Sequence, residues 1–272
     1  MILHQFKSLI RFYWKAGTIY NVHSDFLYQF LTTAMDLKKT YYAYPQIELI
    51  RSKLLKNDRV ISIEDLGAGS HKMSTHDRKI SKIASVSVSD LVSCRILFQI
   101  VEYFKCKNIL ELGTSLGISS LYLASSSKDI RVTTIEGDVS IANIARDVHA
   151  EAHADNIQII HGTFEKVLPQ YLKNSAKIDL AFIDGHHDEK ATLDYFNQIL
   201  NHCHYESIII LDDIYWSEGM TQAWMQIARH PKVTLALDLY IMGIVFLKPD
   251  LSKQYITYIP YRFKPWKIGL IG

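Results

Sequence analysis

The sequence lacks any apolar run that approaches the length needed to span a bilayer, and it has little net charge and few cysteines. With 30 Lys and Arg against 28 Asp and Glu, the net charge of +2 argues against a dedicated nucleic-acid-binding protein, although the 12 histidines add positive charge below neutral pH. The three cysteines show no metal-site spacing, and an odd number without a signal peptide is typical of reduced thiols in a cytoplasm. What remains is an ordinary globular composition, 48% hydrophobic, in a chain of 272 residues that can bury a full core.

The first 15 residues combine basic and large apolar side chains. Lys7, Arg11 and Lys15 stand among aromatic and aliphatic residues, with neither the small-residue cleavage site nor the continuous apolar core of a secretory signal. The pattern favours a helix that packs on its own domain or on the partner in a homodimer, over a helix that lies on a membrane surface.

The sequence pattern differs between the first 104 residues and the rest of the chain. Residues 1–104 are mainly helical in pattern, with helices expected at about 22–38, 45–56 and 88–104. From about residue 108, strands alternate with helices, which predicts an α/β fold with a doubly wound, mostly parallel sheet of seven strands. The expected strands are 108–112, 131–136, 157–161, 178–183, 206–211, 232–239 and 241–247, with helices near 117–126, 139–151, 164–172, 188–201 and 217–230. Only a short turn around Tyr240 separates the last two strands, so we expect an antiparallel hairpin at the edge of the sheet.

Residues 109–120, Ile-Leu-Glu-Leu-Gly-Thr-Ser-Leu-Gly-Ile-Ser-Ser, are the most informative stretch. An apolar strand ends at Glu111, a turn with Gly113 and Gly117 follows, and an apolar helix then begins. Glycines allow a ligand to approach the backbone closely, and the start of the helix offers unpaired N–H groups to a carboxylate or phosphate. The acidic-x-Gly-x-x-x-Gly spacing differs from the Gly-x-Gly-x-x-Gly of dinucleotide-binding proteins, so it opposes a nicotinamide-dependent oxidoreductase.

This stretch resembles the first motif of class I S-adenosylmethionine (SAM) methyltransferases, in particular Glu-Leu-Gly-x-x-x-Gly-x-Ser of the catechol O-methyltransferase-like group. The resemblance covers roughly residues 90–250 and implies a Rossmann-like methyltransferase fold; the whole chain resembles class I methyltransferases common in Bacteroidetes genomes. We therefore expect a helical N-terminal extension over residues 1–90 and a SAM-binding methyltransferase domain over residues 91–272. The first-motif residues expected at the cofactor are Glu111, Gly113, Thr114, Ser115, Gly117 and Ser119.

Two further turns complete the expected cofactor site. The second strand ends in Glu136, and an acid at that place can accept hydrogen bonds from both hydroxyls of a ribose. The third strand leads to His161-Gly162-Thr163-Phe164, which the resemblance places beside the adenine ring, with Phe164 stacked on it; Thr163 is also suited to cap the following helix. A second glycine-rich segment, 63–71, precedes no apolar helical face and no second strand ending in an acid, so we interpret it as a loop of the N-terminal region.

Two apolar strands run directly into carboxylates, Asp184 after the fourth strand and Asp212 and Asp213 after the fifth. Open α/β sheets bind ligands at the carboxyl ends of their strands, and three carboxylates gathered there repel one another unless a cation or protons intervene. Oxygen ligands of this kind suit Mg²⁺ or another hard divalent cation. The resemblance implies the same residues, because catechol and caffeoyl-coenzyme A O-methyltransferases hold their metal with an Asp after strand four and an Asp-Asn pair after strand five. Asp184 also belongs to the expected cofactor site, and the alternative is that Asp212 or Asp213 caps the helix near residue 217.

His186 and His187 follow Asp184 closely, and a histidine is a suitable general base near pH 7. The Asp-Asp pair resembles metal-dependent sugar O-methyltransferases, whose proposed base is the second Asp of an Asp-Gly-Asp; His186 stands at that position here. His187 stands where the catechol enzymes carry their catalytic Lys. We expect one of the two to be the base and favour His186; the alternatives are that they bind the metal or cap the helix at residue 188.

These observations predict a SAM-dependent O-methyltransferase that methylates a phenolic or sugar hydroxyl of a small molecule, with Mg²⁺ or another divalent cation, in the cytoplasm. A tRNA-modifying methyltransferase of the same fold and a non-catalytic SAM-binding protein are the alternatives. The near-neutral charge disfavours the first, because phosphate recognition depends on positive charge.

Overall fold

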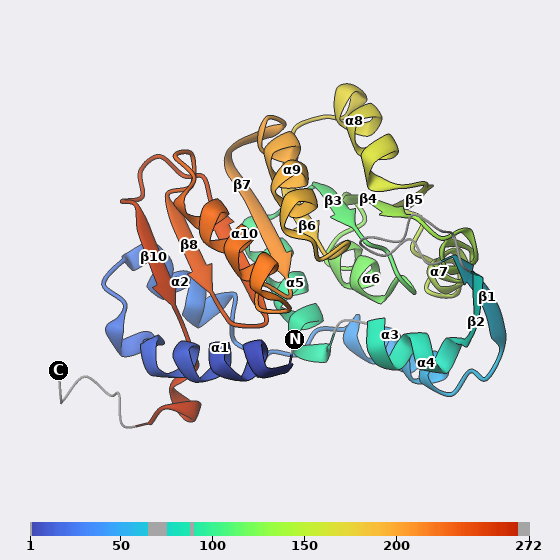
Figure 1. Cartoon of the computed structure of the whole chain (residues 1–272), viewed down its shortest axis with the longest axis horizontal. Coiled ribbons are helices and arrows are strands. Elements are labelled where there is room, and N and C mark those ends of the chain that lie inside the picture. The colour runs from blue at the N-terminus through green and yellow to red at the C-terminus, as the bar shows by residue number, and fades with distance from the viewer. Residues whose placement is uncertain (1, 65–74, 88–89, 266–272) are drawn as a thin grey trace. The chain divides into compact units, whose positions relative to one another are not determined.

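The computed structural model describes residues 2–64, 75–87 and 90–265, and it has an α/β architecture with a central, mostly parallel sheet flanked by helices (Figure 1). The chain forms two compact units, which we call unit 1, Met1–Asp36 with Asp179–Gly272, and unit 2, Leu37–Ile178. The expected division into a helical N-terminal extension, residues 1–90, and a SAM-binding methyltransferase domain, residues 91–272, stays a prediction.

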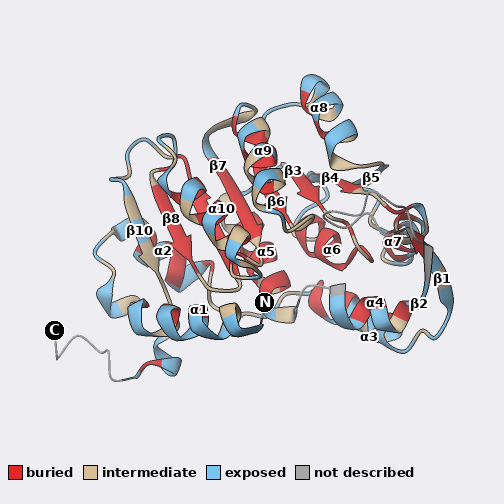
Figure 2. Ribbon diagram, viewed as in Figure 1, coloured by how far each residue is buried: buried red, intermediate tan, exposed pale blue. Residues whose placement is uncertain are grey.

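Unit 2 contains three parallel strands in the order β3-β4-β5, namely β3 (Asn108–Leu112), β4 (Arg131–Glu136) and β5 (Ile157–His161). Glu111 pairs with Thr134 and Glu136 with His161, so the strands end at a common edge. β3 and β4 are buried along most of their length, as is usual for parallel strands that are covered on both faces (Figure 2). The helices of unit 2 are α3 (Tyr44–Leu55), α4 (Ile80–Ser87), α5 (Leu91–Phe104), α6 (Ile118–Ala124), α7 (Val139–Glu151) and α8 (Phe164–Asn174).

The core of unit 2 brings together apolar residues of α3, α4, α5, α6 and α7. Tyr44 lies at its centre, with its ring centroid 5.2 Å from that of Phe98 and 5.4 Å from that of Tyr122. No single helix among the described residues has both the length and the apolar composition to cross a membrane; one bent pair, Ile80–Val86 with Leu91–Phe104, meets the criterion by length and composition.

An antiparallel pair of strands, β1 (Val60–Glu64) and β2 (Thr75–Lys79), also belongs to unit 2. The sequence did not predict this pair, because β2 is polar and charged throughout and shows no apolar alternation. The glycine-rich segment 63–71 starts at the end of β1, and from residue 65 onward it lies outside the described residues.

Unit 1 contains strands in the order β10-β8-β9-β7-β6. Their bounds are β6 (Ile178–Ile183), β7 (Cys203–Asp212), β8 (Leu235–Asp238), β9 (Met242–Phe246) and β10 (Gln254–Thr257). The predicted antiparallel hairpin is present, because β9 runs antiparallel to both β7 and β8, but its expected place at the edge of the sheet was wrong, because β10 lies beyond β8. The helices are α1 (Ile2–Lys15), α2 (Asp25–Thr33), α9 (Glu189–Leu200) and α10 (Glu218–Arg229), with 3-10 helices η1 (Ile19–Asn21) and η2 (Tyr261–Phe263).

The sheet has eight strands, so the prediction of seven was wrong, and the strand that it missed is β10. β10 pairs in parallel with β8, from Gln254 opposite Leu235 to Thr257 opposite Asp238. Its four residues have no fully buried side chain and too short a pattern to indicate a strand. This segment is a strand because it forms hydrogen bonds with β8, a partner that the local sequence of β10 does not indicate.

Candidate functional site

The glycine turn of unit 2 joins β3 to α6 and requires unusual backbone geometry. Gly113 (φ 101°) and Gly117 (φ 82°) both adopt the left-handed region that favours glycine. At Gly117 a Cβ atom would lie 2.5 Å from Nε2 of His149, so a side chain at this position would collide with α7. The two glycines of the motif are therefore needed for the turn itself.

Glu136, at the end of β4, is bonded directly to this turn. Its Oε2 accepts a hydrogen bond from the backbone N of Ser115 (2.9 Å), and its Oε1 accepts one from the backbone N of Asp138 (3.0 Å). Burial raises the pKa of Glu136, while these two N–H groups favour its ionised form. Each carboxylate oxygen keeps capacity to accept another hydrogen bond, as a ribose hydroxyl would require.

Glu111 lies in the same turn region and is fully buried. The hydroxyl of Ser120 donates to its Oε2, whereas its Oε1 is buried without a hydrogen-bond partner in the described chain. Burial raises the pKa of Glu111 to about 7, because a charged carboxylate loses its hydration. An unpaired buried oxygen of this kind is costly, which makes it a site for a missing hydrogen-bond donor.

Of the other residues of the first motif, some pack within the turn, and one has a hydroxyl group without a hydrogen-bond partner in the described chain. The Thr114 hydroxyl bonds to that of Thr134 (2.6 Å), and Ser119 is buried in the first turn of α6. Ser115 is held at φ 47°, and its hydroxyl oxygen is buried without a partner in the described part of the chain. Thr114 therefore braces the turn, while Ser115 offers an unused polar group beside it.

The turn after β5 lies next to Glu136, because Glu136 and His161 are paired across the strands. Gly162 (φ 145°) donates its N–H to the carbonyl of Glu136 (2.9 Å), and a Cβ there would lie 2.7 Å from Val167. Thr163 stands at the N-cap of α8, but its side chain makes no capping hydrogen bond, and Phe164 is half-buried as the first helical residue. Unit 2 thus brings Glu111, Glu136 and the 162–164 turn to one edge of the sheet.

His149 was not identified from the sequence as part of this region. Its Nε2 lies 3.2 Å from the carbonyl O of Gly117, and burial lowers its pKa to about 4. A neutral His149 therefore ties α7 to the second glycine of the motif over the physiological pH range. Its position on the inner face of α7 resembles that of any buried helix residue, so the sequence carried no signal for this role.

In unit 1 the strand ends carry unusual backbone conformations at non-glycine residues. His186 (φ 68°) and His187 (φ 28°) follow β6, Asp213 (φ 52°) follows β7, and Tyr240 (φ 70°) lies in the turn between β8 and β9. These are four of the seven non-glycine residues with positive φ in the described chain. Such conformations cost free energy and persist where function or surrounding structure imposes them, so this end of the sheet is the candidate site of unit 1.

The two histidines have different surroundings. His187 Nε2 lies 3.9 Å from Asp184 Oδ1, and its ring centroid is 5.9 Å from that of Trp216. Burial lowers the pKa of His187, and the negative charge of Asp213 acts in the opposite direction. His186 Nδ1 instead lies 2.9 Å from the hydroxyl of Tyr195 on α9.

The alternative that these histidines, or Asp212 and Asp213, cap the following helices is not what the structure shows. Asp188 caps α9 by accepting from the N of Ala191 (3.0 Å), and Ser217 caps α10 by accepting from the N of Met220 (3.1 Å). The carboxylates and histidines that precede these caps are therefore not needed to start either helix.

The expected metal ligands were Asp184, Asp212 and Asp213. Within the described residues, no group of three His, Cys, Asp or Glu side chains is arranged so that it could hold a metal ion. Asp212 pairs with Met242 of β9, and Asp213 donates its N–H to the carbonyl of Ile241 (3.0 Å). The strand ends thus carry the carboxylates that were expected, without a formed three-ligand cage.

A network of tyrosines around the buried carboxylate of Asp238 holds the loop that carries these residues. Tyr215 and Tyr255 both donate to Asp238 Oδ2, at 2.6 and 2.7 Å, and Asp238 Oδ1 accepts from the N of Tyr240 (2.9 Å). The rings of Tyr215 and Tyr240 stack, with centroids 5.0 Å apart. Burial raises the pKa of Tyr215 and of Asp238, and the three donors offset the cost of the buried carboxylate.

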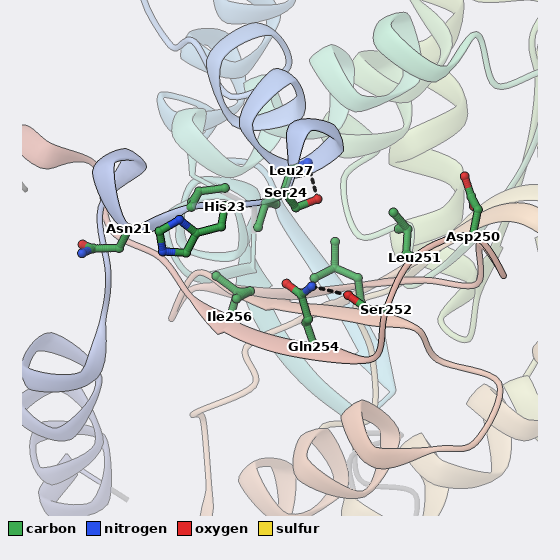
Figure 3. A pocket seen from close by; sticks show the side chains of 11 residues that line it. Asn21, His23, Ser24, Leu27, Asp250, Leu251, Ser252, Gln254 and Ile256 are labelled. Carbon is green, nitrogen blue, oxygen red and sulfur yellow. Dashed lines mark hydrogen bonds between the residues drawn. The ribbon is translucent and has the colours of Figure 1, made fainter.

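Two cavities lie elsewhere. One of about 310 Å³ in unit 1 lies among η1, the start of α2 and the approach to β10 (Figure 3), with Asn21, His23, Asp250 and Gln254 among its lining residues. The other, of about 540 Å³ in unit 2, lies at the amino ends of β3, β4 and β5. Neither includes a predicted site residue, and open α/β sheets bind their substrates at the carboxyl ends of the strands.

Comparison with known proteins agrees with this geometry. Residues 110–214 match the profile of a family described as a methyltransferase domain, from within β3 to just after β7. The chain is 28% identical over 166 residues to a catechol O-methyltransferase of Niastella koreensis, covering 57% of this chain and 74% of the relative. It is 30% identical over 114 residues to the O-methyltransferase imqG of Aspergillus flavus, covering 40% of this chain and 45% of that protein.

A solved structure extends the similarity to the fold. The O-methyltransferase of Bacillus cereus, crystallised in complex with SAH, superposes with a TM-score of 0.55 at 20% identity, covering 79% of this chain and 96% of that one. The matched family region contains the glycine turn, Glu136, the 162–164 turn and the histidines after β6. Residues 110–214 therefore form a methyltransferase domain, and the chain is similar to SAM-dependent O-methyltransferases, the catechol enzymes among them.

Proposed function

We propose that SAM binds at the carboxyl ends of β3, β4 and β5, and that its methyl group is transferred to a phenolic or sugar hydroxyl of a small molecule. The observation that carries the proposal is the hydrogen bond from Ser115 N to Glu136 Oε2 (2.9 Å). It makes the strand-end acid and the glycine turn one site, in which Glu136 accepts from the ribose hydroxyls.

The chemistry of the unused polar atoms fits this cofactor. SAM carries an ammonium group, and the unpaired Oε1 of Glu111 is a buried acceptor that such a donor would satisfy. Ser115 supplies a second unused hydroxyl, and Gly162 and Phe164 would border the adenine ring. All of these residues lie in unit 2.

The residues of unit 1 are proposed to act on the acceptor. SAM supplies an electrophilic methyl carbon: its C–S bond breaks as the acceptor oxygen bonds to carbon, the electron pair goes to sulfur, and S-adenosylhomocysteine (SAH) leaves. The acceptor must lose a proton, and a neutral histidine after β6 takes it. Burial lowers the pKa of His187 and keeps it neutral, while His186 has its Nδ1 engaged by Tyr195 and would act through Nε2.

A divalent cation is a separate part of the proposal. Asp184, Asp212 and Asp213 offer the oxygen ligands that Mg²⁺ prefers, and a bound cation would favour the ionised acceptor. The described residues form no group of three metal ligands. Removal of the acceptor proton by a histidine does not require a bound metal. The proposed location in the cytoplasm rests on the odd number of cysteines, three, and on their lack of metal-site spacing.

The ribose contact gives the first prediction. Replacing Glu136 with Ala should weaken SAH binding by about 1.5–3 kcal/mol, the usual loss for hydrogen bonds to a charged group. Isothermal titration calorimetry measures the change, and Asp65→Ala, in the other glycine-rich segment, is the control that should bind normally. Loss of binding in Asp65→Ala with normal binding in Glu136→Ala would show that the cofactor uses the other segment.

The raised pKa of Glu111 gives a pH dependence. An ammonium group next to Glu111 favours its ionised form, so binding lowers a pKa that is about 7 in the free protein. SAH affinity should therefore rise as pH increases through 7 and level off above it, with a slope approaching about tenfold per pH unit below 7. Calorimetry between pH 5.5 and 8 checks this; Glu111→Gln should bind more weakly with no such slope, and an unchanged slope in that variant would exclude Glu111.

The requirement for a cation is tested by removing it. Excess chelator should stop methyl transfer from SAM to a panel of phenols and sugars, and added Mg²⁺ or Mn²⁺ should restore it. Asp212→Asn should raise the cation concentration needed for half-maximal rate. Full activity in excess chelator, with no metal found in the protein by elemental analysis, would leave histidine as the sole means of acceptor ionisation.

The base is identified by paired variants. The variant that removes the base should lose about 10²–10⁴ in kcat yet keep its SAH affinity, the usual share of general-base catalysis. His186→Ala and His187→Ala are compared with His202→Ala, which lies in the turn before β7 and should be near wild type. A large loss of kcat in His186→Ala alone would place the base where the sugar O-methyltransferases have it. A large loss in His187→Ala alone would place it at the position of the catalytic Lys of the catechol enzymes. No loss in either variant would remove both histidines from the mechanism.

A further inference from the structure

The N-terminal helix α1 turns only one side toward its own unit. Ser8 and Phe12 are buried, His4 Nε2 lies 3.0 Å from the hydroxyl of Thr221, and Gln5 donates to the carbonyl of Trp216 (3.1 Å). Tyr240 also donates its hydroxyl to the carbonyl of Gln5 (2.9 Å). These contacts fix the rotation of the helix about its axis, so the opposite side is held outward.

The outward side of α1 is apolar over its whole length. Figure 2 shows most of this helix as exposed, and its large apolar side chains range from 44% exposed at Leu9 to 80% at Ile2. The exposed members are Ile2, Leu3, Phe6, Leu9, Ile10 and Trp14. At 100° per residue they span about 140° of the helix circumference, which is a continuous face rather than scattered single residues. A continuous apolar patch of this kind marks a docking surface.

The charge of α1 is entirely positive. Lys7, Arg11 and Lys15 are exposed and follow one another at intervals of four residues, so they form a stripe along one border of the apolar face. The 14 residues of the helix contain no Asp or Glu. A partner of this surface must therefore be both apolar and negatively charged.

A second segment, distant in sequence, extends the same surface. Lys264 is buried with its Nζ donating to the carbonyls of Tyr13, Trp14 and Ala16, the last at 2.9 Å, so it caps the carboxyl end of α1. Next to it, η2 exposes Tyr261 (52%) and Phe263 (53%) together with Arg262. The surface thus has aromatic and basic side chains at one end as well as along the helix.

We propose that this protein docks on the surface of an anionic lipid bilayer through the exposed face of α1 and η2, with the apolar side chains in the headgroup region. Aromatic residues beside Lys and Arg on an amphipathic helix are the composition that binds such interfaces. A second copy of the chain is a poorer partner, because a twofold contact would bring Lys7, Arg11 and Arg262 of both copies together without an acidic residue of α1 to offset them.

The test is flotation of the full-length protein with vesicles of phosphatidylcholine, with or without phosphatidylglycerol. Binding should require the anionic lipid and weaken with added salt. Lys7→Ala with Arg11→Ala should lower the partition coefficient about 25-fold, at roughly fivefold per basic residue. Phe6→Ser with Trp14→Ser should lower it at least as much, since each loses a large apolar contact.

Matched controls separate docking from misfolding and from general charge. Lys166→Ala with Lys173→Ala removes two exposed charges from α8 and should leave vesicle binding unchanged. The α1 variants should keep the wild-type SAH affinity, because the cofactor residues lie in unit 2. Equal binding by the α1 and α8 variants, or no binding to anionic vesicles, would overturn the proposal. If the wild type does not bind vesicles but forms dimers that Phe6→Ser/Trp14→Ser loses, the face contacts a second copy of the chain. If the wild type does not bind vesicles but is retained on RNA in a salt-sensitive way, the face binds a nucleic acid.

Discussion

A buried carboxylate must be surrounded by hydrogen-bond donors, and this requirement shapes the strand ends of both units. Glu136 has backbone N–H groups of Ser115 and Asp138, and Asp238 has two tyrosine hydroxyls and the N–H of Tyr240. Each carboxylate thereby fixes a loop that the sequence leaves undefined. The glycine turn is held at the end of β4 in unit 2, and the 213–216 and 239–241 loops are held around β8 in unit 1.

Glu111 departs from this rule at one oxygen, and the departure is informative. Oε2 is paired with Ser120, whereas Oε1 is buried without a partner in the described chain. An unpaired buried acceptor of this kind is destabilising, and in the proposed function the ammonium group of SAM supplies the missing donor.

The tyrosine network also connects the candidate acceptor residues to the surface helix. Tyr240 stacks on Tyr215 on one side, lies 5.4 Å from the ring of Phe12 on the other, and donates to the carbonyl of Gln5. Gln5 in turn holds the carbonyl of Trp216, the residue whose ring lies against His187. Direct contacts within unit 1 therefore connect α1 with the loop after β7.

The sequence by itself determined the alternation of strands and helices, the acidic residues at or next to the ends of β3, β4, β6 and β7, and the glycine spacing typical of SAM-dependent methyltransferases. These features depend on residue type and local period, so they can be seen without any partner. Only the tertiary structure decided that β10 is a strand, that His149 supports Gly117, and that α1 buries Phe12 while exposing Phe6. Each of these depends on hydrogen bonds or burial against residues far away in the sequence, and a local pattern contains no information about which distant group will be there.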